Sequence, residues 1–254
     1  MSRKARRISE LGLYHVIFRG MNHCHLFEDD TDYLKFLEML SELKGKMKFE
    51  IYSYCLMSNH VHIFLHEKEA GSLITLMRKL LTRYAGWFNR KYQRSGSLIA
   101  NRYKSEVVNK DEYVFELVRY IHQNPIRAGM VEKLKNYRWS SYLDYLRYKE
   151  EDITDVGFLL DMMSKSQIDA LKIFEKLHNE QEKQVFVINE GKRKSDEEVR
   201  RVVMQEINGI EPHKIGEMPR NERNIVLAKL KGKRLSIRQI ERCTGISRGI
   251  ISKC

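Results

Sequence analysis

Two histidines separated by one residue are the first feature of the sequence that could support catalysis. His60 and His62 flank Val61 in a segment, residues 60–65, whose branched and aromatic residues favour a β-strand. Because side chains alternate between the two faces of a strand, both imidazoles are expected on one face, close enough to share a cation. Imidazole suits Mn²⁺, Zn²⁺ or a loosely held Mg²⁺. Such pairs are also common on exposed strands, so the pair alone does not establish a metal site.

The second feature is a tyrosine placed four residues before an asparagine. Tyr120 and Asn124 fall near the end of a segment, Asp111 to about Gln123, whose apolar spacing predicts a helix that Pro125 would end. A spacing of four places both side chains on one helical face. The carbonyl oxygen of Asn124 could then be a third metal ligand, with the phenolic oxygen of Tyr120 beside the metal. The alternative is a tyrosine at a buried edge, followed by an asparagine that ends the helix.

These residues need a scaffold, and the hydrophobic pattern of residues 1–148 predicts one. Its order is β-α-β-β-α-β followed by a further helix, which is the split βαβ or ferredoxin-like pattern. We therefore expect an α+β domain with an antiparallel sheet, helices on one face and the other face available for a site. The expected strands are residues 13–20, 48–56, 60–65 and 105–108, and the expected helices are residues 33–43, 72–92 and 111–123.

The charge of the chain favours a nucleic-acid partner. The 254 residues include 46 Lys+Arg and 34 Asp+Glu, a net charge of +12. Residues 1–148 carry a net +9, residues 149–190 a net −5 and residues 191–254 a net +8. Basic blocks bind phosphates by releasing counterions, although a solvated basic surface would give the same totals.

Other aspects of the composition exclude several classes of protein. No stretch is long and apolar enough to span a membrane, and the basic N-terminus lacks the apolar core of a secretory signal. The four cysteines form no CxxC pair and lie far apart, which argues against a zinc knuckle or a disulfide framework. We therefore expect a cytoplasmic protein without a membrane partner.

Six stretches together make the sequence similar to a known family. The chain resembles the single-tyrosine HUH transposases, and most closely the REP-associated tyrosine transposases. The resemblance covers residue 13 to about residue 146, more than half of the chain. The matching stretches, in the family's order, are YHVIFRG (14–20), FEDDTDY (27–33), YSYCLMSNHVHIFL (52–65), NRYKSEVV (101–108), YIHQNPIRAGMV (120–131) and YRWSSY (137–142).

The resemblance implies a role for each matching residue. It makes His60 and His62 ligands of Mg²⁺ or Mn²⁺, Asn124 the third ligand and Tyr120 a nucleophile that forms a 5′-phosphotyrosine. The implied activity is DNA nicking and strand transfer on single-stranded or hairpin DNA, by a monomer or a homodimer. Ser58 departs from the family, where a proline is expected. Motif residues implied to line the DNA path are Asn59, Arg102, Tyr103 and Lys104.

Two other functions remain open at this point. A DNA-binding regulator derived from a transposase would have lost catalysis, and the intact histidines, Tyr120 and Asn124 argue against it. A metal-dependent phosphodiesterase could use the histidine pair to hydrolyse DNA without covalent attachment, and it would not need Tyr120. A covalent DNA–protein adduct would distinguish the three.

The rest of the chain predicts a connector and a second domain. Residues 149–190 read as an acidic helical connector, and residues 191–254 as short helices. Residues 235–253 resemble a helix-turn-helix whose second helix would present Arg248 and Lys253 to a duplex major groove. The same block is distantly similar to the DNA-binding domain of the bacterial replication initiator. A generic small helical bundle is the alternative.

Overall fold

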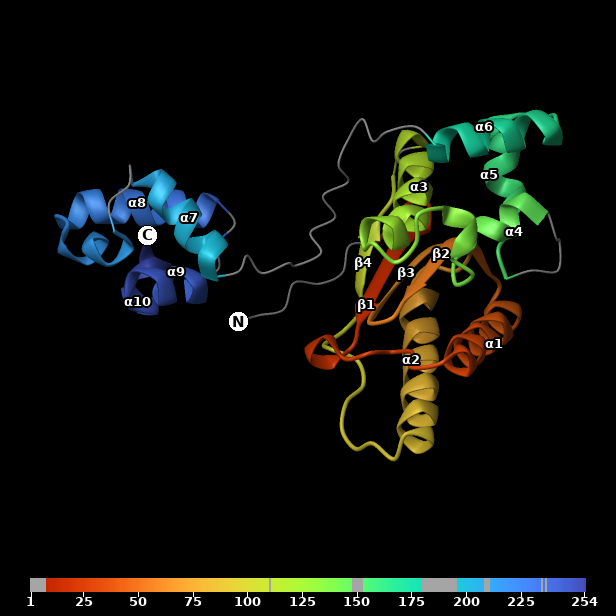
Figure 1. Cartoon of the computed structure of the whole chain (residues 1–254), viewed down its shortest axis with the longest axis horizontal. Coiled ribbons are helices and arrows are strands. Elements are labelled where there is room, and N and C mark those ends of the chain that lie inside the picture. The colour runs from red at the N-terminus through yellow and green to blue at the C-terminus, as the bar shows by residue number, and fades with distance from the viewer. Residues whose placement is uncertain are drawn as a thin grey trace. The chain divides into compact units, whose positions relative to one another are not determined.

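The computed structural model divides the chain into two compact units, Met1–Phe186 and Val187–Cys254. Figure 1 shows a mixed sheet-and-helix unit and a separate helical unit. Each unit has its own buried apolar core. The residues that the structure describes are 8–109, 111–147, 153–179, 196–207, 211–233, 235 and 237–254.

The first unit is built on a four-stranded antiparallel sheet. Its strands are β1 (Leu13–Arg19), β2 (Phe49–Met57), β3 (His60–Glu67) and β4 (Lys104–Val107). The order across the sheet is β2-β3-β1-β4, and every neighbouring pair is antiparallel. The α+β fold with an antiparallel sheet is thus confirmed, and each predicted strand agrees with the observed one to within two residues at either end.

Two helices cover one face of this sheet, as the ferredoxin-like pattern predicts. They are α1 (Asp30–Met47) and α2 (Ser72–Lys91). Phe18 of β1 packs on Phe36 of α1, with ring centroids 5.9 Å apart. The side chain of Glu67, at the end of β3, accepts a hydrogen bond from the backbone N–H of Leu73 at the start of α2. α1 begins at a capping box in which the Asp29 and Asp32 side chains accept each other's backbone N–H groups.

A third helix, α3 (Asp111–Arg127), packs against β2 and β3 on the opposite face. The predicted end of this helix at Pro125 is wrong, because the helix continues for two more residues. Proline has no N–H for the carbonyl of Ile121, four residues earlier. The side-chain nitrogen of Asn124 donates to that carbonyl instead, at 3.3 Å. The helix ends only before Gly129, whose φ of +67° closes a turn in which Met130 N–H donates to the Pro125 carbonyl.

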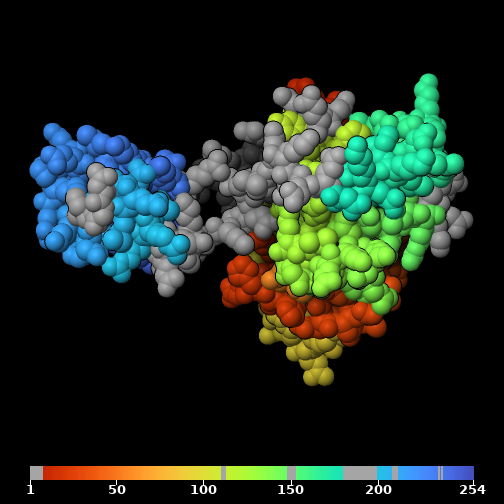
Figure 2. Space-filling model, turned by 45° about the horizontal axis from the view of Figure 1, so that its top comes forward, coloured from red at the N-terminus to blue at the C-terminus, as the bar shows by residue number. Residues whose placement is uncertain are grey.

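Three shorter helices complete the first unit, and they correct the predicted boundary at residue 148. They are α4 (Tyr142–Arg147), α5 (Val156–Met163) and α6 (Gln167–Asn179). α5 contacts β2 and α6 contacts α3, so most of the predicted connector belongs to the first unit. In Figure 2 the turquoise surface of residues 156–179 adjoins the green surface of residues 111–147. The apolar stripes of α5 and α6 explain this packing, since Leu159 and Phe174 are fully buried.

In the second unit, the residues that the structure describes form helices and the turns that connect them. Its α-helices are α7 (Asp196–Glu206), α8 (Arg220–Gly232), α9 (Ile237–Thr244) and α10 (Arg248–Lys253), and a 3₁₀ helix spans Pro212–Glu217. Val203, Leu227 and Ile240 lie at the centre of its core. The predicted boundary between residues 190 and 191 lies outside the described residues. Among the residues described in either unit, no helix has the length and hydropathy of a membrane span.

Candidate active site

The two histidines of the predicted metal site lie side by side on β3. His60 and His62 point to the sheet face that α3 covers, and their ring centroids are 5.0 Å apart. His62 is fully buried, whereas His60 is partly exposed. The alternation of the strand therefore brings both imidazoles together, as their spacing predicts.

Each of these imidazoles is oriented by a second side chain. The Nδ1 atom of His60 lies 2.8 Å from Oδ1 of Asn59, an acceptor, so Nδ1 carries the proton and donates it. The Nδ1 atom of His62 lies 3.0 Å from Nε2 of His15 on β1. In both rings Nε2 is then the nitrogen suited to a metal ion, and the partner at Nδ1 fixes the ring in place.

His15 is a site residue that the sequence analysis missed. It occupies the centre of β1, is 99% buried, and stacks on His62 with an interplanar angle of 17°. The alternation of β1 could have indicated it, because His15 and Arg19 share one face of the strand. The register confirms this face, since Arg19 pairs with His60 across the sheet.

Burial favours the neutral form of His15 and His62 by lowering the pKa of each. Desolvation lowers the pKa of His15 to about 3. Desolvation also holds the pKa of His62 well below its usual value, and positive charge on His15, His60, Arg19 and Arg127 acts in the same direction. A neutral imidazole with a fixed tautomer is the state that binds a divalent cation.

The predicted nucleophile, Tyr120, projects from α3 onto His62 and His15. Its ring stands nearly perpendicular to that of His62, at 80° and 5.7 Å between centroids, and lies 6.3 Å from the ring of His15. The side chain is 4% exposed. The guanidinium carbon of Arg127, two helical turns further along α3, lies 4.6 Å from the Tyr120 ring centroid. Tyr120 is thus between a histidine cluster and an arginine.

Asn124, the predicted third ligand, lies one turn beyond Tyr120 and is buried. Its Nδ2 donates to the Tyr120 carbonyl at 2.9 Å and to the Ile121 carbonyl at 3.3 Å. Because the nitrogen is held by the helix backbone, the side-chain oxygen is the atom that can bind a cation. Within the described residues no three His, Cys, Asp or Glu side chains form a metal site, so a metal here needs this amide in addition to the histidines.

The residues expected along the DNA path have different surroundings. Lys104 begins β4 and pairs with Ile17 on the histidine face, and its side chain is exposed. Arg102 is exposed in the preceding loop. Tyr103, by contrast, is only 8% exposed and belongs to the core of the unit. Asn59 contacts His60 directly, as described above.

The second unit contains the predicted pair of helices with a tight turn between them. Gly245 follows α9 with a φ of +73°, Ile246 is buried, and Ser247 occupies the N-cap position of α10 without a side-chain capping bond. Arg248, one of the two residues expected to face a DNA groove, forms an ion pair with Glu241 at 2.8 Å. Lys253 is exposed.

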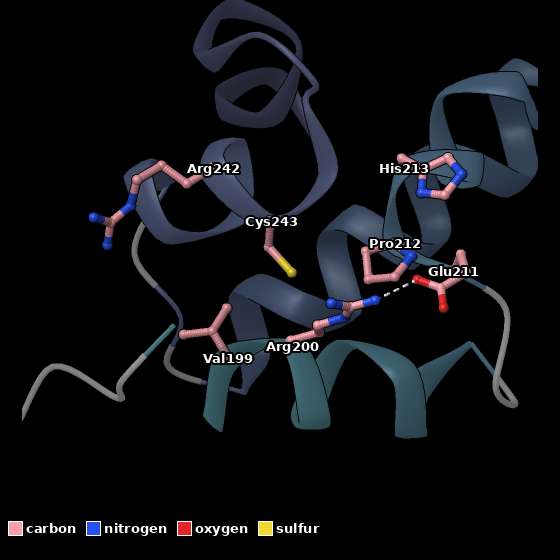
Figure 3. A pocket seen from close by; sticks show the side chains of 7 residues that line it. All are labelled: Val199, Arg200, Glu211, Pro212, His213, Arg242 and Cys243. Carbon is pink, nitrogen blue, oxygen red and sulfur yellow. Dashed lines mark hydrogen bonds and ion pairs between the residues drawn. The ribbon is translucent and has the colours of Figure 1, made fainter. Parts of the chain in front are cut away.

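The second unit also has a cavity of about 350 Å³, between α7, the 3₁₀ helix and α9 (Figure 3). The thiol of Cys243 points toward its centre, and Arg200 and Glu211 form an ion pair of 2.9 Å at its edge. The carboxylate of Glu211 compensates the charge of the Arg200 guanidinium.

Several known proteins are similar to this chain. A curated relative from Haemophilus influenzae, provisionally named a REP-associated tyrosine transposase, is 24% identical over 156 residues, which cover 56% of this chain and 86% of that protein. A solved REP-associated tyrosine transposase bound to a REP hairpin is similar in fold, with a TM-score of 0.50 and 16% identity over 61% of this chain and 94% of that one. A structure from Deinococcus radiodurans, provisionally described as a transposase, has a TM-score of 0.31 and 18% identity over 48% of this chain and 95% of that one.

A sequence model of a protein family matches part of the first unit. Residues 9–124 match the model described as IS200-like transposase. The matched segment starts just before β1 and ends at Asn124, so it contains both histidines, Tyr120 and the whole sheet. Residues 9–124 of the first unit are therefore similar to the IS200-like transposases.

Proposed function

We propose that the chain is a metal-dependent DNA nicking and strand-transfer enzyme in which Tyr120 forms a 5′-phosphotyrosine. The observation that supports this most strongly is the placement of the Tyr120 ring 5.7 Å from the ring of His62, on a sheet face that also carries His60. A hydrolase that activates water would not need a tyrosine at this position. The match of residues 9–124 to the model of IS200-like transposases is the second support.

Three side chains would hold the metal ion, which we propose to be Mg²⁺ or Mn²⁺. They are His60 and His62 through Nε2, and Asn124 through its side-chain oxygen. When bound, the cation would polarise a non-bridging oxygen of the scissile phosphate and offset the charge that develops there. Asn59 and His15 would keep the two imidazoles in the orientation that this requires.

The chemical step is an exchange of phosphate esters. The phenolic oxygen of Tyr120 attacks phosphorus and gives up its proton, and the bond from phosphorus to the 3′-oxygen breaks. That oxygen takes up a proton, which leaves a free 3′-OH and a 5′-phosphotyrosine. The new ester conserves the energy of the old one, so a second 3′-OH can reverse the reaction and join another strand without ATP.

Two arginines would assist this step electrostatically. The guanidinium of Arg127 over the Tyr120 ring stabilises negative charge that develops on the phenolic oxygen. Arg19 lies on the same face, paired with His60. Positive charge on both arginines lowers the pKa of His62, so both would lie near a phosphate bound beside that histidine.

The proposed substrate is single-stranded DNA, or a hairpin with a single-stranded cleavage site. Tyr120 is at the bottom of the site and can reach a phosphate only outside a stacked duplex. The solved relative that is bound to a REP hairpin supports a hairpin. The exposed Arg102 and Lys104, and possible duplex contacts of the second unit through Arg248 and Lys253, would add phosphate contacts.

The test is a cleavage assay with oligonucleotides from the flanks of the native gene, labelled at the 3′ end, in Mn²⁺ or Mg²⁺. We expect a labelled protein band on a denaturing gel, because the 5′ end of the labelled fragment becomes bound to Tyr120. Cleavage without this band would indicate a phosphodiesterase. Binding without cleavage would indicate a DNA-binding regulator derived from a transposase.

A further inference from the structure

A second cavity lies beside the candidate active site and has a different chemical character. It measures about 310 Å³ and opens between β4 and the first turns of α3, with His15 of β1 in its wall. Glu106 and Asn109 line one side, and Tyr113 and Leu117 line the other. In the sheet, Glu106 is the direct neighbour of His15, so the cavity is on the same face as the histidine cluster.

The cavity and the nucleophile share one stripe of α3. Tyr113, Leu117 and Tyr120 are spaced four and three residues apart, so their side chains follow one another along one face of the helix. His15 connects the two places, since it lines the cavity while its ring contacts those of Tyr120 and His62. A DNA strand with its phosphate at Tyr120 would therefore bring an adjoining nucleotide to the cavity.

The size and lining of the cavity suit a flat heterocycle. Its volume is at the lower end of the range for small-molecule sites, which fits one planar group better than a larger ligand. Tyr113 is 43% exposed and presents an aromatic ring at the edge, while Leu117 and two valines provide apolar walls. Every nucleobase has a π-face that can stack on such a ring.

The polar groups in the wall can distinguish among bases. The carboxylate of Glu106 accepts hydrogen bonds only, and it matches the exocyclic amino group of cytosine or adenine. Burial raises the pKa of Glu106, an effect that Lys104 partly offsets. The Nδ1 atom of His15 is buried and has no hydrogen-bond partner among the described residues. A bound base would supply that partner, and the amide of Asn109 can serve as donor or acceptor.

We propose that this cavity binds the unpaired nucleobase next to the scissile phosphate, with Tyr113 stacked on the base and Glu106 accepting from its exocyclic amino group. The inference rests on the proposed function for the identity of the ligand, a single DNA strand. It adds a preference at one position of the cleavage site, because thymine has no exocyclic amino group. Cytosine, adenine and guanine have one, and they are favoured there.

The experiment measures binding without cleavage. Fluorescence anisotropy in EDTA gives the Kd of the full chain for short homopolymers of deoxycytidine, deoxyadenosine and thymidine. The thymidine homopolymer is expected to bind about 5-fold more weakly than the other two, or weaker still. Tyr113→Ala should weaken binding of the deoxycytidine homopolymer by about 5- to 150-fold, the effect of one lost base stack. Tyr113→Phe should bind as the wild type does, because the ring remains.

Two further variants test the assignment of each group. Ile74→Ala removes an exposed apolar side chain (52%, against 43% for Tyr113) from α2 on the opposite face, and it should leave every Kd unchanged. Glu106→Gln preserves volume but replaces an acceptor by a mixed amide, so the preference over thymidine should shrink. Equal Kd values for wild type and Tyr113→Ala, or an unchanged preference in Glu106→Gln, would overturn the inference.

Failure of the inference can be distinguished from failure of the proposed function. These Kd values do not depend on a metal ion or on Tyr120 as a nucleophile. A chain that shows the base preference but forms no covalent adduct would retain the cavity assignment and lose the nicking reaction. A chain that forms the adduct and shows no base preference would do the reverse.

Discussion

The substitution Phe174→Ala tests whether α6 is part of the catalytic unit, as the structure has it, or part of a connector. Phe174 is fully buried. Its ring stacks on that of Tyr145, with 4.5 Å between ring centroids. The ring centroids of His178 and His122 lie 4.2 Å and 6.0 Å from that of Phe174. Removing a buried phenyl ring costs roughly 3–5 kcal/mol, through lost transfer free energy and the cavity that remains.

This loss should appear in one of two thermal transitions. For a unit of this size, 1 kcal/mol corresponds to about 2–4 °C, so the Tm of the first unit should fall by roughly 6–20 °C. The assay is differential scanning calorimetry of the full chain, in which the second unit serves as an internal reference. Ile173→Ala, at a neighbouring position that is 43% exposed, is the control and should change stability by no more than about 0.5 kcal/mol. A shift below about 2 °C for Phe174→Ala would refute the packing of α6 on the first unit.

Four other outcomes are expected. Tyr120→Phe should abolish cleavage and adduct formation with little change in Kd for uncleaved DNA; normal cleavage would assign the nucleophile to another residue. His60→Ala and His62→Ala should each suppress Mn²⁺- or Mg²⁺-dependent cleavage, because two remaining ligands hold a divalent ion poorly, and wild-type cleavage in EDTA would contradict the metal. Burial lowers the pKa of His178 to about 4, so between pH 6.5 and 4 the unfolded chain binds a proton that the folded chain does not. Urea unfolding should therefore show stability falling by about 1.4 kcal/mol per pH unit below pH 6.5 for this group, and His178→Gln should reduce that slope. A chain truncated after Phe186 should still cleave, and its binding to longer DNA should depend less steeply on salt; an unchanged slope would show that the second unit does not neutralise phosphates.

Local sequence patterns predicted the sheet and its helices well. The alternation of aromatic and branched residues located every strand. The helix expected over residues 33–43 lies inside α1, which begins three residues earlier because Asp29 is its N-cap, and ends four residues later. The same alternation placed His60 and His62 together, and the spacing of four placed Tyr120 and Asn124 on one face of α3. These predictions depend only on the periods of strand and helix.

Contacts between distant segments could not be predicted in this way. His15 and His62 are 47 residues apart, and His122 and His178 are 56 apart, so no local period connects them. The same reason explains why the acidic segment reads as a connector. The apolar residues of α5 and α6 predict that one side of each helix is buried, but they do not predict which segment covers it. The helix continues past Pro125 because the Asn124 side chain donates to the Ile121 carbonyl in place of the missing proline N–H. Helix propensities describe residues singly and do not include such a hydrogen bond.

The buried hydrogen bonds around His122 have a consequence for any assembly of two copies. His122 Nδ1 lies 2.9 Å from Nε2 of His178, and its Nε2 lies 2.7 Å from the hydroxyl of Ser141. His178 Nδ1 donates to the Phe174 carbonyl, so Nε2 of the neutral His178 accepts from His122 Nδ1. Nε2 of His122 then accepts from the hydroxyl of Ser141. His122, two residues after Tyr120 on α3, is therefore hydrogen-bonded to both His178 and Ser141 of its own chain. An exchange of α3 between neighbouring molecules would have to break these bonds in a dry interior, so we expect each Tyr120 of a dimer to act in cis with the histidines of its own chain.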